Sequence, residues 1–143
     1  MYAKPKAITS YGRMANTETD PIRQIVMLYD GAIKFLNLTA MDMESGDLIA
    51  KSEHSDRALE IVMYLQSILD FEKGGDVAVN LDKLYRSITA MVLKASAKTD
   101  AAMMRKAGDL LAPVRDAWQA NANSNASPQA ETAPEGTRFA MVG

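Results

Sequence analysis

Residues Leu69 to Tyr85 read L-D-F-E-K-G-G-D-V-A-V-N-L-D-K-L-Y, and this stretch is the most informative one about the fold. Gly74 and Gly75 accept the positive φ angles that end a helix at little steric cost. Asp76 follows them, and its carboxylate is suited to accept hydrogen bonds from the free backbone N–H groups of a new helical turn. The stretch therefore predicts the end of one helix, a turn at the two glycines and the start of the next helix.

The apolar residues after this turn repeat with helical spacing. They alternate at intervals of four and three residues and comprise Val77, Leu81, Leu84, Ile88, Met91 and Ala95. This spacing predicts a helix over residues 76–97 with one buried side. Similar stripes predict helices at 21–44, 48–71 and 101–121.

Local signals support these boundaries. Asp20 precedes Pro21, which is typical of a helix start, and Asp100 precedes the fourth helix. We expect a kink near Pro113 and not two helices, because the apolar stripe crosses the proline without a change of phase. Four helices with short connections predict an all-α fold, an antiparallel up-down-up-down four-helix bundle over residues 20–121.

The two ends of the chain differ in composition from the helical part. Residues 1–19 have no long apolar period, which predicts a mobile N-terminal arm. Residues 122–143 are rich in Ala, Asn, Ser and Pro, which predicts a disordered C-terminal tail. Residues 138–142 (R-F-A-M-V) leave open a small docking element there, although composition favours no structural role for them.

Composition also excludes several classes of protein. The chain has 143 residues, a net charge of −2 and no long basic run, so we expect no nucleic-acid partner. It has no cysteine, which excludes a disulfide scaffold and a Cys zinc site. It has neither a signal-peptide core nor an apolar run of ~20 residues, so we expect a cytoplasmic protein without membrane insertion.

The sequence gives little support for catalysis. His54 is the only histidine, and its expected helix face holds no obvious carboxylate. One histidine cannot build the paired Glu-x-x-His motifs of a di-iron bundle, so we predict no metal, no cofactor and no enzymatic activity. A histidine phosphotransfer domain is the alternative. An exposed, solvated histidine is favoured over it, because the residues after His54 lack the glycine typical of such domains.

The first helix carries more apolar residues than a bundle core requires. Leu28, Phe35 and Leu38 form a second stripe beside the main one. If exposed, they would contribute to an apolar patch, which in soluble proteins usually marks a partner site. The alternatives are that they pack beneath the N-terminal arm, that the core is wide, or that a homodimer buries the excess.

The chain resembles the family of flagellin-specific export chaperones of bacterial flagellar secretion. Four motifs carry the resemblance: the I-x-x-Y spacing of Ile8 and Tyr11, M-L-Y-D-G-A over 27–32, the opening stretch over 69–85, and D-A-W over 116–118. The chain departs from the family at Ser87, where a second tyrosine is often found, and at Pro113.

The resemblance implies a cytoplasmic chaperone that binds the C-terminal disordered segment of flagellin and prevents its premature polymerisation. It further implies delivery of flagellin to the cytoplasmic domain of the export gate, with Ile8 and Tyr11 in the region that docks there. The groove predicted for flagellin consists of Leu28, Asp30, Gly31, Phe35, Leu38, Asn80 and Tyr85.

Some of these residues have a plainer role as an alternative. Gly31 lies inside a helix, where glycine costs ~1 kcal/mol relative to alanine, so it predicts the close approach of a ligand or of a neighbouring helix. Tyr85 is suited either to bond a bound segment or to pack in the core with its hydroxyl at the edge. We expect Trp118 in the core, closing the end of the bundle opposite Gly74-Gly75.

Overall fold

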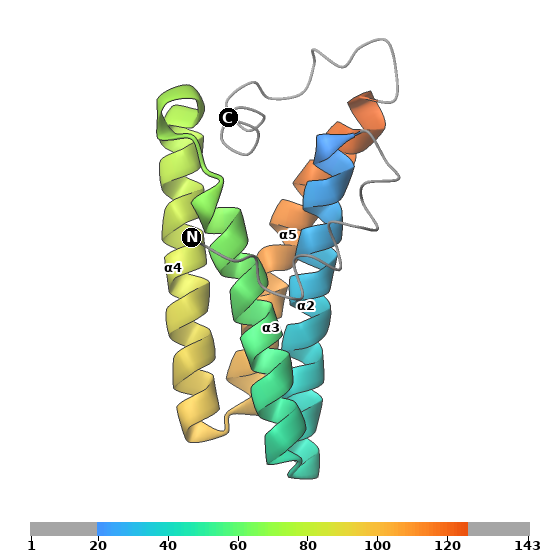
Figure 1. Cartoon of the computed structure of the whole chain (residues 1–143), viewed down its shortest axis with the longest axis vertical. Helices are drawn as coiled ribbons and strands as arrows, with labels where there is room; N and C mark the ends of the chain where they lie inside the picture. Colours follow the sequence, from blue (N-terminus) through green and yellow to red (C-terminus); the bar gives the residue numbers. More distant parts are fainter. Residues whose placement is uncertain (1–19, 126–143) are drawn as a thin grey trace, which may run out of the picture.

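The computed structural model describes residues 20–125, which form four helices (Figure 1). In chain order they are α2 (Pro21–Ser45), α3 (Leu48–Ser67), α4 (Phe71–Lys98) and α5 (Ala101–Asn125). The helices alternate in direction, and α3 and α5 each pack against both α2 and α4. This confirms the predicted all-α, antiparallel four-helix bundle. The predicted arm, with Ile8 and Tyr11, and most of the predicted tail lie outside the described residues.

The ends of α2 follow the signals in the sequence. The Asp20 carboxylate accepts a hydrogen bond of 2.9 Å from the backbone N–H of Ile22, and Pro21 occupies the first turn. At the other end, Gly46 has a φ of 77° and its N–H bonds to carbonyl groups of the last turn. Aspartate and glycine therefore terminate this helix within one residue of the predicted bounds.

The connection between α3 and α4 differs from the prediction. α3 ends at Ser67, and the Asp70 carboxylate caps α4 by accepting a 3.0 Å bond from the Lys73 N–H. The connection therefore lies at residues 68–70, so the predicted helix end at residue 71 and the predicted cap at Asp76 were wrong, whereas the predicted break at the glycine pair is present at Gly75. Ile68 and Leu69 of this connection are partly buried against the core.

The glycine pair nevertheless breaks the helical geometry. Gly75 has a φ of 51° and a ψ of −128°, and this non-helical residue lies one turn inside α4. Residues other than glycine rarely adopt such angles, so glycine is required at this position. The first turn of α4 and the rest of the helix therefore meet at a kink at Gly75.

The fourth helix is one continuous element that passes through Pro113. Asp100 caps it by accepting a 3.0 Å bond from the Met103 N–H, and it continues four residues past the expected end at 121. Trp118 is buried in the core, as predicted. Because α4 begins and α5 ends at the same end of the bundle, Trp118 lies in the half that holds Gly75, not at the opposite end (Figure 1).

None of the four described helices combines the length and the apolar character that crossing a bilayer would require. Their core is built from the predicted apolar stripes, with the largest side chains contributed by Trp118, Tyr29 and Tyr85. Leu28 belongs to this core, with only 6% of its surface exposed. Of the alternatives left open for the second stripe, the wide core holds for Leu28, whereas Phe35 and Leu38 are half-buried.

Candidate functional site

A polar cluster of aromatic side chains lies inside the core. The hydroxyl groups of Tyr29 on α2 and Tyr85 on α4 are hydrogen-bonded to each other, and the side chain of Trp118 also bonds to Tyr29. Both tyrosines are completely buried, with ring centroids 6.4 Å apart. Tyr85 therefore joins α4 to α2 through the centre of the bundle and offers no surface to a partner in this conformation.

Burial shifts the ionisation of both hydroxyl groups. It raises the pKa of Tyr29 to about 12, although the hydrogen bonds with Tyr85 and Trp118 act in the opposite direction. Burial also raises the pKa of Tyr85, and the charge of an ionised Tyr29 would raise it further. Both tyrosines are thus held neutral in the folded state well above the usual range for this side chain.

We expect alkaline titration to reveal this pair. An unfolded tyrosine ionises near pH ~10, whereas folded Tyr29 ionises near pH 12, so the folded state keeps its proton longer. The free energy of unfolding should therefore not depend on Tyr29 below pH ~10 and should fall by about 3 kcal/mol between those values. Tyrosinate absorbance and circular dichroism, recorded together over the pH range, provide the measurement.

Of the five tyrosines in the chain, Tyr29 and Tyr85 should ionise only as the helical signal is lost. A Tyr29→Phe variant is the control, because it removes one of the two delayed transitions. Ionisation of all five near pH ~10 with an intact helical signal would contradict the buried pair.

Phe35 is engaged in a contact between α2 and α3. Its ring stacks on the imidazole of His54 with centroids 5.9 Å apart, and the Arg57 guanidinium lies 5.9 Å from its centroid. His54 Nδ1 also lies 2.6 Å from Asp42 Oδ2 on α2. The interpretation of His54 as exposed and without a carboxylate neighbour was wrong, because its partner belongs to another helix.

The outer side of α2 carries three further predicted residues. Asp30 accepts a 2.5 Å hydrogen bond from Arg115 Nη1 on α5. Gly31 is buried and lines a shallow hollow of about 230 Å³ together with Asp30 and Lys34. Leu38 is half-buried on the same side. We call Asp30, Gly31, Phe35 and Leu38 the α2 face.

The structure does not bring all the predicted groove residues together. Asn80 is exposed on α4. In the bundle α2 and α4 lie diagonally, because α3 and α5 separate them. The α2 face and Asn80 therefore lie on different sides of the molecule, while Leu28 and Tyr85 lie in the core between them. A ligand in one groove would reach only part of the set, and a ligand that wraps around the bundle would reach both sides.

One apolar surface of α4 was not recognised from the sequence as a candidate site. Asp82 accepts a 2.7 Å bond from Gln66 of α3, and the Ser96 carbonyl accepts a 3.1 Å bond from Lys51 of α3, so this flank of α4 faces α3. The opposite flank, toward α5, carries a row of half-buried apolar side chains at a spacing of seven residues. They are Val77, Leu84 and Met91.

A matching row lies on α5. Arg105 and Arg115 form ion pairs with α2 residues Glu44 and Asp30, which fixes the flank of α5 that faces α2. The other flank faces α4 and carries Met103, Leu110 and Val114. We call the two rows the α4–α5 seam: Val77, Leu84, Met91, Met103, Leu110 and Val114. The seven-residue spacing of the α4 row was the sequence signal that could have identified this surface. The sequence pattern instead predicted that these residues lie in the core, because spacing does not distinguish a fully buried side chain from a half-buried one.

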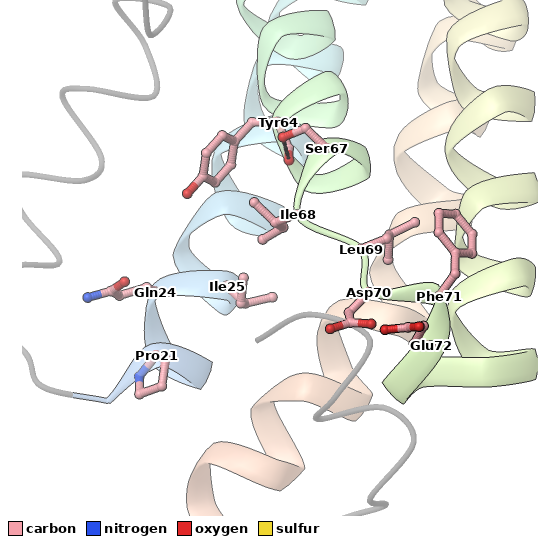
Figure 2. A pocket seen from close by; sticks show the side chains of 10 residues that line it. All are labelled: Pro21, Gln24, Ile25, Tyr64, Ser67, Ile68, Leu69, Asp70, Phe71 and Glu72. Carbon is pink, nitrogen blue, oxygen red and sulfur yellow. Dashed lines mark hydrogen bonds between the residues drawn. The ribbon is translucent and has the colours of Figure 1, made fainter. Parts of the chain in front are cut away.

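A larger cavity opens at the end of the bundle where α2 begins and α3 turns into α4 (Figure 2). Its volume is about 680 Å³. It is lined by residues of α2, of the end of α3, of the 68–70 turn and of the start of α4 (Figure 2). Among residues 20–125, no three His, Cys, Asp or Glu side chains gather as a metal site would need.

A family model described as the flagellar protein FliS matches residues 4–125. The chain belongs to the FliS family. The flagellar secretion chaperone FliS of Salmonella typhimurium is 36% identical over 100 residues, which cover 69% of this chain and 74% of that protein. FliS of Vibrio cholerae is 34% identical over 98 residues, covering 68% and 72%. FliSB of Pseudomonas aeruginosa is 30% identical over 122 residues, covering 82% and 96%.

Membership of the FliS family gives the chain a role in flagellar biogenesis as an export chaperone, and the family consists of chaperones and not of enzymes. The predicted resemblance is confirmed. In this FliS-family fold the described residues offer a partner the α2 face, the α4–α5 seam and the cavity at the end of the bundle, among other exposed positions.

Proposed function

We propose that this chaperone binds the C-terminal disordered segment of flagellin in the cytoplasm, prevents its premature polymerisation and delivers it to the cytoplasmic domain of the flagellar export gate. The observation that carries this proposal is the FliS family match over residues 4–125. The surface of the bundle supports it, because two half-buried apolar regions remain on different sides of the described structure.

The α4–α5 seam suits the apolar face of an amphipathic helix. Its rows run along two antiparallel helices. When an amphipathic helix binds in such a groove, its apolar side chains at intervals of three and four residues insert between the two helices. Met91 and Met103 add unbranched side chains that adjust to the shape of a ligand. A disordered segment that becomes helical on such a surface loses conformational entropy when it binds, which lowers its affinity.

The α2 face is the second contact region in this proposal. Phe35 and Leu38 supply apolar surface, and Gly31 lets a chain approach the helix backbone beside Asp30. Because this face lies away from the seam and from Asn80, a flagellin segment that contacts all of them must wrap around the bundle. Leu28 and Tyr85 support these contacts from beneath as core residues.

Wrapping also explains how polymerisation would be prevented. A bound segment has its apolar face buried against the chaperone, so this face is not available for pairing with other flagellin molecules. Docking on the export gate is assigned in this proposal to Ile8 and Tyr11 of the N-terminal arm, on the basis of the family's I-x-x-Y spacing.

Calorimetry with a synthetic flagellin C-terminal peptide tests the binding step. The full chain should form a stoichiometric complex at micromolar concentrations, with a negative heat-capacity change from buried apolar surface. An Ile8→Ala, Tyr11→Ala double variant should bind the peptide with unchanged affinity but fail to support flagellin export in cells. A peptide of the same composition in scrambled order is the control, and absence of binding to the native peptide would refute the proposal.

The two alternatives from the sequence have tests of their own. A phosphotransfer role needs an accessible imidazole, and the His54 side chain is 27% exposed, stacked on Phe35 and bonded to Asp42 through Nδ1. Acid-labile phosphate that disappears in His54→Gln would nevertheless establish that role. A homodimer of the free protein through the seam would show as sedimentation that changes with concentration.

A further inference from the structure

The cavity at the end of the bundle has an apolar wall and an acidic rim. Ile25 of α2 and Ile68 and Leu69 of the turn line its inner side, and Phe71 lies at the start of α4 (Figure 2). Phe71 remains 51% exposed, although it is the largest apolar side chain of this wall. A surface of this kind gains stability when a further apolar group covers it.

The charged side chains among the described residues that line the cavity are both acidic. Asp70 uses Oδ1 to cap α4 through the Lys73 N–H, and Glu72 occupies the first turn of that helix. No basic side chain is among these lining residues. The cavity is therefore complementary to a ligand that presents a cationic group beside a bulky apolar one.

We propose that residues 138–142 of the same chain dock in this cavity. After Asn125 the sequence has a single basic residue, Arg138, and its bulky apolar side chains are confined to Phe139, Met141 and Val142. Phe139 covers the apolar wall beside Phe71, and Arg138 lies against the carboxylates of Asp70 and Glu72. The chain thus carries its own ligand for the cavity.

The end of α5 places this segment within reach. α5 ends at the same end of the bundle at which α2 begins and the α3–α4 turn lies (Figure 1). Residues 126–137 connect Asn125 to Arg138; a flexible chain of this length spans roughly 20 Å and an extended one roughly 40 Å. Neighbouring helices are about 10 Å apart, so the connection needs no strained path.

Tethering makes even a weak contact effective. A ligand joined by a short flexible linker experiences an effective concentration on the order of millimolar. A docked tail covers Phe71 and Ile68 in the free protein, and any other ligand of this end of the bundle must displace it. The proposal concerns the free chain alone, so its test does not depend on flagellin binding.

A spin label provides the test, because the chain has no cysteine of its own. Full-length Ala140→Cys, carrying a nitroxide, should broaden the amide signals of Ser67, Leu69 and Phe71 and leave α4 near Leu93 unaffected. Phe139→Ala in the labelled chain should lower the docking equilibrium constant about tenfold and restore these signals. Broadening that is absent, spread evenly over the bundle or unchanged in Phe139→Ala would overturn the proposal.

Charge reversal provides a second, independent readout. Arg138→Glu should weaken docking about threefold, and Glu72→Arg combined with it should restore the broadening. A label at Ala7→Cys reports on the competing occupant, the N-terminal arm. If the Ala7 label broadens the cavity signals and the Ala140 label does not, the arm is the occupant and the proposal is wrong.

Discussion

Replacing Trp118 with alanine should lower the free energy of unfolding by about 3–5 kcal/mol. Only 1% of the Trp118 surface is exposed, and it is the largest fully buried side chain in the described structure. The substitution removes the apolar contacts of Trp118. It also removes the hydrogen bond between Trp118 and the Tyr29 hydroxyl, so this buried hydroxyl loses one of its hydrogen-bond partners. A domain of this size is stable by only about 5–15 kcal/mol, so the loss is a large part of the total.

Urea denaturation followed by circular dichroism measures this loss, because the variant has no tryptophan left for fluorescence. Leu93→Ala is the matched control: Leu93 is a large apolar residue of α4 with 56% of its surface exposed, and its truncation should cost less than about 1 kcal/mol. Equal losses in the two variants, with an unchanged slope against urea, would show that Trp118 does not anchor the core.

A second large effect is expected for Leu110→Arg in the α4–α5 seam. It should weaken the binding of the flagellin C-terminal peptide about 30-fold, because an anchor in a groove is worth about 2 kcal/mol and the new charge has no partner in an apolar contact. Leu110 is 38% exposed, so an arginine there can extend its head group into solvent and leave the bundle stable. Calorimetry of the variant with the peptide measures the change.

Val79→Arg is the matched control for the seam. Val79 is also an exposed apolar residue, at 42%, but it lies outside the two rows of the seam, on the flank of α4 that faces away from α5. Its substitution should change peptide affinity by less than about threefold. If both variants lose affinity equally, the seam is not the binding surface; if Leu110→Arg binds normally, the seam contributes no anchor at that point.

Helix caps and periodicity explain why most of the fold was predictable. Asp20 and Gly46 terminate α2 through bonds to its own first and last turns, which are contacts local in sequence. The α3–α4 turn was misplaced because Asp70 and Asp76 are both competent caps. In the structure Asp70 caps α4, and Ile68 and Leu69 before it are partly buried against the core, a contact that no local pattern contains.

The candidate site depended more strongly on long-range contacts. The partner of His54 is Asp42 on another helix, and Asp30 pairs with Arg115 far along the chain. Leu28 followed the expected stripe but was buried, because α2 packs closely on both α3 and α5 and its covered surface is wide. Helical spacing gives the angular position of a residue around the axis of its own helix. It does not give the position of the neighbouring helices.

Capping and periodicity act within a few residues, so the four helices, their order and most of their ends are readable from local pattern, while the four ordered motifs indicate the family. How much of each apolar stripe stays partly exposed depends instead on contacts between helices. The tertiary structure buried Leu28 and Tyr85 and left Val77, Leu84 and Met91 as one half of the α4–α5 seam. The physical reason is that burial depends on how closely neighbouring helices approach, and that distance is set by all four helices packing together.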